Sequence, residues 1–279
     1  MNFIRIFLMT IFLSFNAISA EGDNPVGKLK WQLGPSSETI AGKATLKIPK
    51  DYGYLDEVET SKYAELSHNP STGKDILFTN GKWEAYFSFD PIGYVKDDET
   101  IDADKVLEEY KKGVEIGNAE RKKKGWETLD VDGWFFKPQY DKNKRLLEWA
   151  FLLKDSETKK PIVNYYTRIL GRAGVMSVIL VATPEYMHEA ISDFKDKLGG
   201  FEYNSGERYT EFKQGDKIAE YGLAALILGG AAAVATKKGF WAVLAGFFAA
   251  AWKFIVVAVV AFFSKIKDLF NSLFKKSDK

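Results

Sequence analysis

LLEWAFLL (146–153), IVNYYTRIL (162–170) and VMSVILVA (175–182) follow one another with only short polar connections between them. Each run is rich in aromatic and β-branched residues, which is typical of β-strands. A fourth strand is predicted just upstream, at 133–137. None of the connections has room for a crossover helix, so the four strands should pair as an antiparallel meander.

The chain before this meander alternates between strand and helix patterns. Asn80-Gly81 is a strong hairpin dipeptide, and it separates strands predicted at 76–79 and 83–89. Another strand is predicted at 44–48, where apolar and polar residues alternate up to a proline. Helices are predicted at 56–69, 102–124 and 184–198.

The helix at 102–124 has clear signals at both ends. Asp102 can cap its N-terminus and Gly125 ends it. Its apolar stripe consists of Ala103, Val106, Leu107, Tyr110 and Val114. A stripe of this width packs against a sheet. The predicted fold class is therefore α+β, with a mainly antiparallel sheet and packed helices, followed by C-terminal transmembrane helices.

Residues 1–20 have the pattern of a secretory signal peptide. Arg5 precedes an apolar core at 6–15, and small residues lead to a cleavage site after Ala20. The core is too short to span a bilayer of about 30 Å at about 1.5 Å per residue. An uncleaved anchor is the alternative, because Ile18 is larger than the residue usual at its position.

The C-terminal region is apolar and predicts membrane helices at 217–263. Residues 239–263 are long enough to span a bilayer despite Lys253. Residues 218–236 are marginal, and a short span, a re-entrant helix and an interfacial helix are all compatible with their length.

Residues 264–279 form a basic amphipathic tail that suits a headgroup region; the alternative is a helix packed on protein. The tail lies in the cytoplasm if one segment spans, which its lysines favour, and on the exported side if both span. Either way, 21–216 is predicted to be an exported α+β domain.

The composition excludes several kinds of function. Residues 1–20 contain one arginine, and 217–279 contain nine lysines and three acids, so 29 basic and 35 acidic side chains remain in 21–216, a net charge of −6. That balance does not predict a nucleic-acid partner. The chain has no cysteine, which excludes disulfides and thiolate chemistry. Its two histidines, His68 and His188, are far apart, so we expect no metal and no cofactor.

Five acids lie close together at the start of the long helix. They are Asp97, Asp98, Glu99, Asp102 and Asp104. Clustered carboxylates can bind Ca²⁺, but the glycine and glutamate positions of an EF-hand loop are not matched. A solvated acidic helix start is the favoured interpretation.

Short motifs spread along the mature chain carry a resemblance to a known family. They are WQLGP (31–35), GYVKDD (93–98), IDAD (101–104), Asn118 with Arg121, Gly133-Trp134, Pro138 with Tyr140-Asp141, LEWA (147–150), VNY (163–165), Arg168 with LGR (170–172) and Gly174, and YGLA (221–224). With them, the chain resembles a family of bacterial uncharacterised membrane-anchored proteins, a domain of unknown function. The resemblance implies a signal peptide, one exported domain and C-terminal membrane helices, and it brings no activity. The element order also resembles, as an analogy of fold alone, the sandwich shared by the photosystem accessory protein PsbP and the nuclear-import factor Mog1.

Polar side chains on the long helix and on one strand are the best candidates for a site. Asn118 and Arg121 share a helix face near its buried stripe, and Asn164, Tyr166 and Arg168 share one strand face. These groups either form a satisfied buried network or a ligand site. The candidate cluster is completed by Asp141, Glu148 and Arg172. In one register of the 146–153 and 162–170 hairpin, Glu148 lies opposite Arg168 and pairs with it.

The expected function is that of a membrane-anchored binding or scaffold module of the cell envelope. The alternative is an envelope enzyme that uses Asn118, Arg121 and Arg168 with Asp141 or Glu148. The expected location is the bacterial inner membrane, with the main domain in the periplasm. The expected partners are membrane lipid and an envelope protein.

Overall fold

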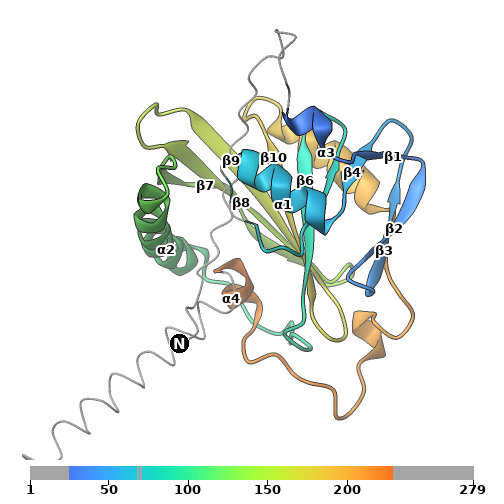
Figure 1. Ribbon diagram of the computed structural model, residues 1–279. Helices are drawn as coiled ribbons and strands as arrows, with labels where there is room; N and C mark the ends of the chain where they lie inside the picture. Colours follow the sequence, from blue (N-terminus) through green and yellow to red (C-terminus); the bar gives the residue numbers. More distant parts are fainter. Residues whose placement is uncertain (1–24, 68, 70, 229–279) are drawn as a thin grey trace, which may run out of the picture. The chain divides into compact units, whose positions relative to one another are not determined.

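An eight-stranded antiparallel sheet forms the centre of the domain, in the order β1-β4-β5-β6-β10-β9-β8-β7 (Figure 1). The computed structural model describes residues 25–67, 69 and 71–228. The strands are β1 (Gln32–Leu33), β4 (Gly53–Leu55), β5 (Ile76–Thr79), β6 (Glu84–Asp90), β7 (Leu129–Asp141), β8 (Leu146–Asp155), β9 (Pro161–Leu170) and β10 (Val175–Ala182). The α+β class and the meander β7-β8-β9-β10 are confirmed.

The hairpin predicted around Asn80-Gly81 is also confirmed, because β5 pairs with β6 antiparallel. Gly81 has a φ of +82°, which the turn requires and glycine adopts without strain. Strand β6 also pairs with β10. This pairing joins the strands β1, β4, β5 and β6 to the meander β7-β8-β9-β10 in a single sheet.

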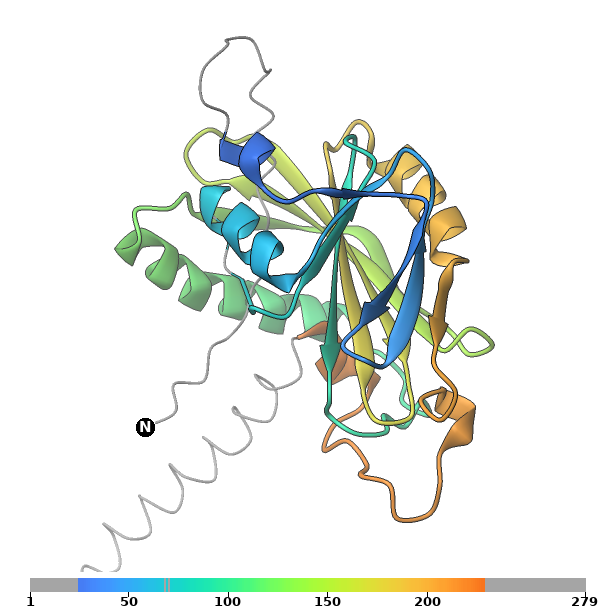
Figure 2. The ribbon, with the colours of Figure 1, turned by 45° about the vertical axis from the view of Figure 1, so that its right-hand side comes forward.

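One face of the large sheet is covered by a small sheet and a helix. The small sheet has the order β11-β3-β2, with β11 at Phe201–Tyr203, β3 at Ala44–Ile48 and β2 at Ser36–Ile40. Helix α3 (Met187–Leu198) lies beside it (Figure 2). Ile40, Leu46 and Phe194 are almost fully buried against the sheet, so this layer is an apolar core.

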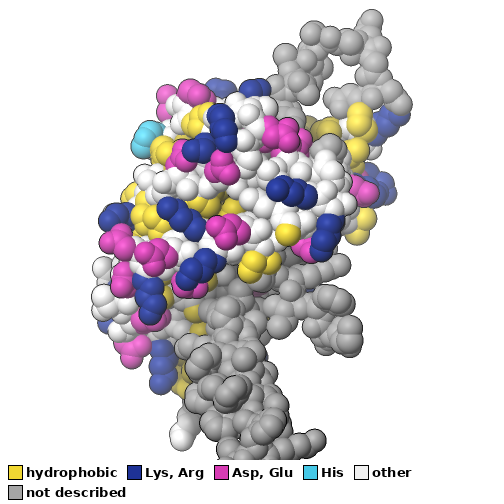
Figure 3. Space-filling model, turned by 90° about the vertical axis from the view of Figure 1, so that its left-hand side faces the viewer, with side chains coloured by type: hydrophobic (Ala, Val, Ile, Leu, Met, Phe, Trp, Pro, Cys, Tyr) yellow, Lys and Arg dark blue, Asp and Glu magenta, His cyan; other side chains and the backbone are white. Residues whose placement is uncertain are grey.

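The opposite face carries three helices and a second core. They are α1 (Glu57–Leu66), α2 (Ala103–Lys123) and α4 (Leu223–Ile227). Two short 3₁₀ turns, η1 (Pro25–Lys28) and η2 (Tyr209–Glu211), complete the described elements. The outer side of the domain near α2 shows acidic and basic side chains intermixed (Figure 3).

Helix α2 forms where the sequence predicts it. The Asp102 side chain accepts a hydrogen bond from the Lys105 amide, which caps the helix. Val106, Tyr110 and Val114 of the predicted stripe are buried. The Tyr110 ring stacks on Phe151 with 3.5 Å between the ring centroids, so the helix is fixed to the sheet through aromatic contact.

Four short strands and the full length of β7 are not evident from the sequence. β1, β2, β4 and β11 have two to five residues each, too few to show a reliable alternation. Strand β7 contains Gly133 and Pro138 and has three irregularities in its pairing with β8. Bulges and a proline are features of edge strands, and they protect β7 from pairing with another chain.

The packed core continues beyond the predicted domain end at residue 216. Leu223, Leu226 and Ile227 of α4 are almost fully buried in the core that covers the α2 face of the sheet. The predicted boundary therefore falls short of the core, which runs to Ile227. A short helix cannot be recognised as a core element from sequence when it lies at the start of a long apolar run.

Several predicted segments lie outside the described residues. They are the signal peptide at 1–20, the strong membrane segment at 239–263, the tail at 264–279 and the part of the marginal segment after residue 228. Within the part of the chain that the structure describes, no helix is long and apolar enough to cross a membrane.

Candidate functional site

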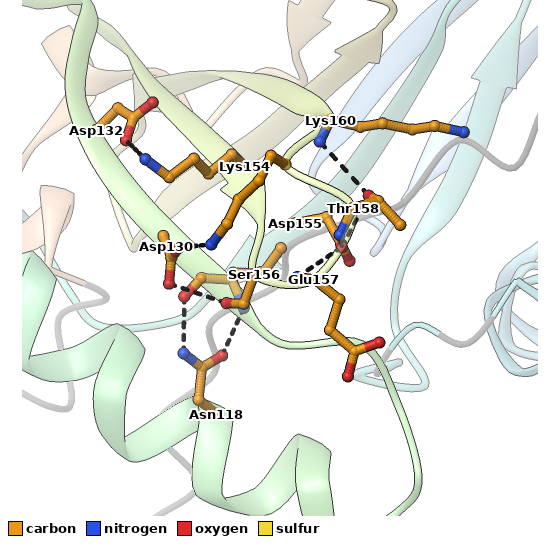
Figure 4. Close-up of polar contacts among 11 residues, drawn as sticks. Asn118, Asp130, Asp132, Lys154, Asp155, Ser156, Glu157, Thr158 and Lys160 are labelled. Carbon is orange, nitrogen blue, oxygen red and sulfur yellow. Dashed lines mark hydrogen bonds and ion pairs between the residues drawn. The ribbon is translucent and has the colours of Figure 1, made fainter.

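Asn118 and Arg121 bind the backbone at the start of β7 rather than other site residues. The Asn118 side-chain amide donates to the Leu129 carbonyl at 2.7 Å and accepts from the Leu129 amide at 2.9 Å (Figure 4). The Arg121 guanidinium donates to the Glu127 carbonyl and stacks near the Trp126 ring. Both residues thus join the C-terminal half of α2 to the edge strand.

The polar groups around them are also used in structural contacts. Ser156 donates to Asp130 at 2.9 Å, and Asp155 accepts from the amides of Glu157 and Thr158 in the turn between β8 and β9 (Figure 4). At the opposite end of β7, far from Asn118, Asp141 accepts from the amides of Asn143 and Lys144 in the turn that follows the strand. These contacts complete two turns and join the turn after β8 to β7, so they are structural.

The predicted pairing of Glu148 with Arg168 is wrong by one residue. In the β8–β9 ladder Leu147 lies opposite Arg168, and Glu148 lies opposite Thr167. Because side chains alternate between the faces of a sheet, this slip places Glu148 and Arg168 on opposite faces. Glu148 instead accepts from the Tyr165 hydroxyl and pairs with Lys195 of α3 at 2.8 Å.

A double-mutant cycle on Glu148→Gln and Arg168→Met should therefore give a coupling free energy near zero, measured by urea unfolding. A cycle on Glu148→Gln and Tyr165→Phe serves as the positive control and should give about 0.5–3 kcal/mol, because those two groups are in direct contact. Coupling of similar size in both cycles would show that the register is wrong.

Arg172 does not join the other candidates either. Its guanidinium binds Asp216 through two nitrogens, at 2.7 and 2.8 Å, and donates to the Gly206 carbonyl. The hydrogen bond from Arg172 lowers the pKa of Asp216 to about 2. This pair fastens the segment 212–222, which we call the C-terminal strap, to the turn between β9 and β10.

The Arg172–Asp216 pair should contribute stability above pH about 4, the ordinary range of a free aspartate, and lose it as the pH falls toward 2. The sign follows because the pKa of Asp216 is lower in the folded state than in the unfolded chain. A carboxyl ¹³C NMR titration should place this pKa at about 2. In Arg172→Met it should return toward about 3.9; an unchanged value would contradict the assignment.

Arg168 has a different environment. It is half-buried, its guanidinium lies over the Trp149 ring at 5.0 Å from the centroid, and it donates one hydrogen bond, to the neighbouring Thr167 carbonyl at 3.1 Å. Among the described residues, no carboxylate lies within ion-pair distance of it. Trp149 itself is stacked on Tyr166, so Arg168 rests on a rigid aromatic platform.

Three further polar residues surround Arg168 on the same face. Asp90 and Tyr221 are close enough to influence its pKa, and Ser177 lies directly opposite it in β10. The Ser177 hydroxyl donates to Asp90. Burial lowers the pKa of Arg168, and the charge of Asp90 opposes that effect. We call Arg168, Asp90, Ser177 and Tyr221 the Arg168 site.

Asn164 shares this sheet face but lies four residues away along β9. It is fully buried beside Tyr166, whose pKa is raised by burial.

Asn118 lies still farther from Arg168 than Asn164 does. Leu129, which it binds, lies opposite Asp155, whereas Arg168 lies opposite Leu147. Those two positions on β8 are about 26 Å apart at about 3.3 Å per residue. The predicted cluster therefore divides into separate structural contacts and the Arg168 site.

The acidic residues before α2 are also divided among structural roles. Asp97 accepts hydrogen bonds from Arg145 and from Tyr140, the latter at 2.8 Å. Burial alone would raise the pKa of Asp97, but these hydrogen bonds and the charge of Arg145 lower it. Glu99 accepts from the Ala224 amide at the start of α4. Among the described residues, no group of three or more His, Asp or Glu side chains is arranged to hold a metal.

Sequence reasoning found Arg168 but missed its neighbours. Ser177 is the one hydroxyl residue in the apolar run VMSVILVA, and Tyr221 is part of the YGLA motif, so each carried a weak signal. Asp90 carried none, because an aspartate at the end of a strand is ordinary. The strand order that places β6, β10 and β9 side by side is what brings the four residues together.

The fold and this site define an α+β domain with a polar site on a sheet face that is otherwise largely apolar. The chain belongs to the family described as "Protein of unknown function (DUF2167)", which it matches over residues 32–262. A search of curated proteins found no match. The solution structure of cyanobacterial PsbP (CyanoP) from Synechocystis sp. PCC 6803 is similar at 11% identity and a TM-score of 0.36, covering 66% of this chain and 98% of that chain.

Proposed function

We propose that this protein is a membrane-tethered binding module of the cell envelope, and that the Arg168 site receives an anionic group of its ligand. The observation that carries this proposal is the half-buried guanidinium of Arg168, which has an aromatic platform but no ion-pair partner among the described residues. Desolvating a charge is costly unless it is paired, so this position favours a ligand that supplies the negative charge.

A binding role has more support than the enzyme alternative. That alternative needs Asn118 and Arg121 to act together with Arg168, and both of those residues bind backbone at the other end of β8. It also needs Asp141 or Glu148 as a partner. Asp141 accepts a hydrogen bond within a turn, and Glu148 lies on the opposite sheet face, where it pairs with Lys195. An arginine on stacked aromatic rings is a typical recognition element for carboxylate or phosphate groups.

The cell-envelope location rests on the apolar ends of the chain. The signal-peptide pattern at 1–20 directs 21–228 to the periplasm, and 239–263 supplies an anchor. A reporter that requires the cytoplasm for activity, fused after Leu228 so that α4 is retained, should be inactive. Strong activity of that fusion would overturn the periplasmic location.

Native mass spectrometry of the full chain extracted from its own membranes tests the binding role. The wild type should retain an anionic molecule, and Arg168→Met should lose it. Arg208→Met is the matched control, because Arg208 forms an exposed pair with Glu202. Equal retention by all three proteins, or no bound molecule in the wild type, would refute the proposed role of Arg168.

A further inference from the structure

Two opposite charges lie at the same end of one sheet face without forming an ion pair. Asp90 ends β6 and is exposed, and Arg168 lies on β9. Strand β10 separates them, and its Ser177 donates a hydrogen bond to Asp90. Ser177 lies opposite Arg168 and binds Asp90, so the two charges are separated by the width of one strand, and the charge of Asp90 acts on Arg168.

We propose that the Arg168 site binds the zwitterionic headgroup of a phospholipid, with the phosphate at Arg168 and the ammonium group at Asp90. This inference rests on the proposed function and names its ligand class.

The charge arrangement selects against simpler ligands. A lone phosphate gains the attraction of Arg168 but is repelled by Asp90, and a lone ammonium has the reverse difficulty. A headgroup that carries both charges satisfies both side chains at once. Arginine suits the phosphate because its planar fork can donate two parallel hydrogen bonds. The Trp149 ring beneath Arg168 limits its motion, which reduces the entropy lost on binding.

The position of the site in the chain favours a lipid over a soluble ligand. Tyr221 belongs to the site and lies two residues before α4, the last described element. Ten residues, 229–238, separate the described domain from the predicted membrane segment at 239–263. Fully extended, ten residues span at most about 35 Å, and as a helix about 15 Å. This short connection along the chain favours a ligand that comes from the membrane.

The strap that carries Tyr221 is held firmly, so the site is not at the end of a loose linker. The Tyr94 amide donates to the Lys217 carbonyl at 2.8 Å, and the Ala219 amide donates to the Tyr94 carbonyl at 2.9 Å. Gly93 has a φ of +101°, and a Cβ there would lie 2.6 Å from the Lys217 carbonyl, so this close approach requires glycine.

A hollow opens beside Tyr221 and gives a ligand room. Its volume is about 290 Å³, and it is lined by Lys96, Asp98 and Glu99 and by four residues of the strap, Glu220 among them, so carboxylates outnumber cations in the lining. Tyr221 lines this hollow, and it is near enough to Arg168 for that charge to oppose the effect of burial, which raises the pKa of Tyr221.

Calorimetric titration of the full chain in detergent micelles tests the chemistry. The probe is glycerophosphoethanolamine, and the comparison probes are glycerophosphate, inorganic phosphate and ethanolamine. We expect the wild type to bind glycerophosphoethanolamine at least tenfold more tightly than any other probe. Arg168→Met should abolish this binding, Asp90→Asn should reduce it to the level of glycerophosphate, and Arg208→Met should leave it unchanged. Circular dichroism of each variant confirms that it is folded.

The outcomes separate this inference from the proposed function. If glycerophosphate binds as well as glycerophosphoethanolamine, or Asp90→Asn has no effect, the zwitterionic headgroup is refuted while Arg168 stays an anion site. If no probe depends on Arg168, both proposals fail.

A second arm distinguishes a lipid from a soluble ligand of the same chemistry. The full chain is placed in nanodiscs that contain a photoactivatable phosphatidylethanolamine, and its crosslinks are mapped. We expect crosslinks near Tyr221 that free glycerophosphoethanolamine competes away. Binding of the free probe without any such crosslink would overturn the lipid source.

Discussion

A chain comprising residues 25–216 should be far less stable than one comprising residues 25–228. The longer chain keeps Leu223, Leu226 and Ile227, which are almost fully buried in the core on the α2 face of the sheet. Burying one such side chain contributes about 1.5–3 kcal/mol, and unfolded chains already bury part of that surface. The three together should contribute about 4–7 kcal/mol, against a typical total of about 5–15 kcal/mol.

Urea unfolding followed by circular dichroism compares the two chains. We expect a cooperative transition for 25–228 and a much lower midpoint, or no folded baseline, for 25–216. A third chain, 25–228 with Leu226→Ala, should fall between them by losing about 2–5 kcal/mol. Equal midpoints for the two truncated chains would mean that α4 is not part of the core.

Phe151→Ala should destabilise the domain by about 3–5 kcal/mol, the usual range for removing a buried phenylalanine. Phe151 is fully buried between two layers. Its ring stacks on Tyr110 of α2 and, with 4.4 Å between centroids, on Trp134 of β7. The substitution therefore leaves a cavity and also removes the aromatic contacts that hold α2 on the sheet.

Ile116→Ala is the control for Phe151→Ala, because Ile116 lies on α2 but is 55% exposed. It should change the unfolding free energy by less than about 0.5 kcal/mol. Hydrogen exchange gives a second measurement: in Phe151→Ala, amides of α2 should exchange faster relative to those of β10. A loss below about 1 kcal/mol for Phe151→Ala would contradict the stacked arrangement.

The side-chain pattern was enough to predict which residues of α2 face the core. Val106, Tyr110 and Val114 lie on the predicted apolar stripe of the helix. All three are buried in the core that covers the α2 face of the sheet. This prediction succeeded because the faces of a helix follow from its period of about 3.6 residues, which is visible in residues close together along the chain.

Pairing between strands was not predictable in the same way. The residue patterns of β8 and β9 are compatible with Glu148 opposite Arg168 and also with a shift of one residue. In the structure Leu147 lies opposite Arg168. Register depends on the length and geometry of the turn, which contains Asp155 and its hydrogen bonds to Glu157 and Thr158. One residue of slip changed a predicted ion pair into two residues on opposite faces.

Asn118 shows the corresponding difficulty for polar residues on a helix. A side-chain amide near a buried stripe can bind a ligand or satisfy backbone groups, and the local sequence is the same in both cases. The structure assigns the second role, because the end of α2 lies against the unpaired edge of β7 and Leu129 needs partners there.

The sequence by itself determined the α+β class, the antiparallel meander, the long capped helix and the apolar faces, because each depends on residues that are near neighbours along the chain. The tertiary structure alone decided the register of β8 with β9, the inclusion of α4 in the core and the meeting of Asp90, Ser177, Arg168 and Tyr221. Those features join residues up to 131 positions apart, from Asp90 to Tyr221, and depend on strand order and packing geometry that no local pattern specifies.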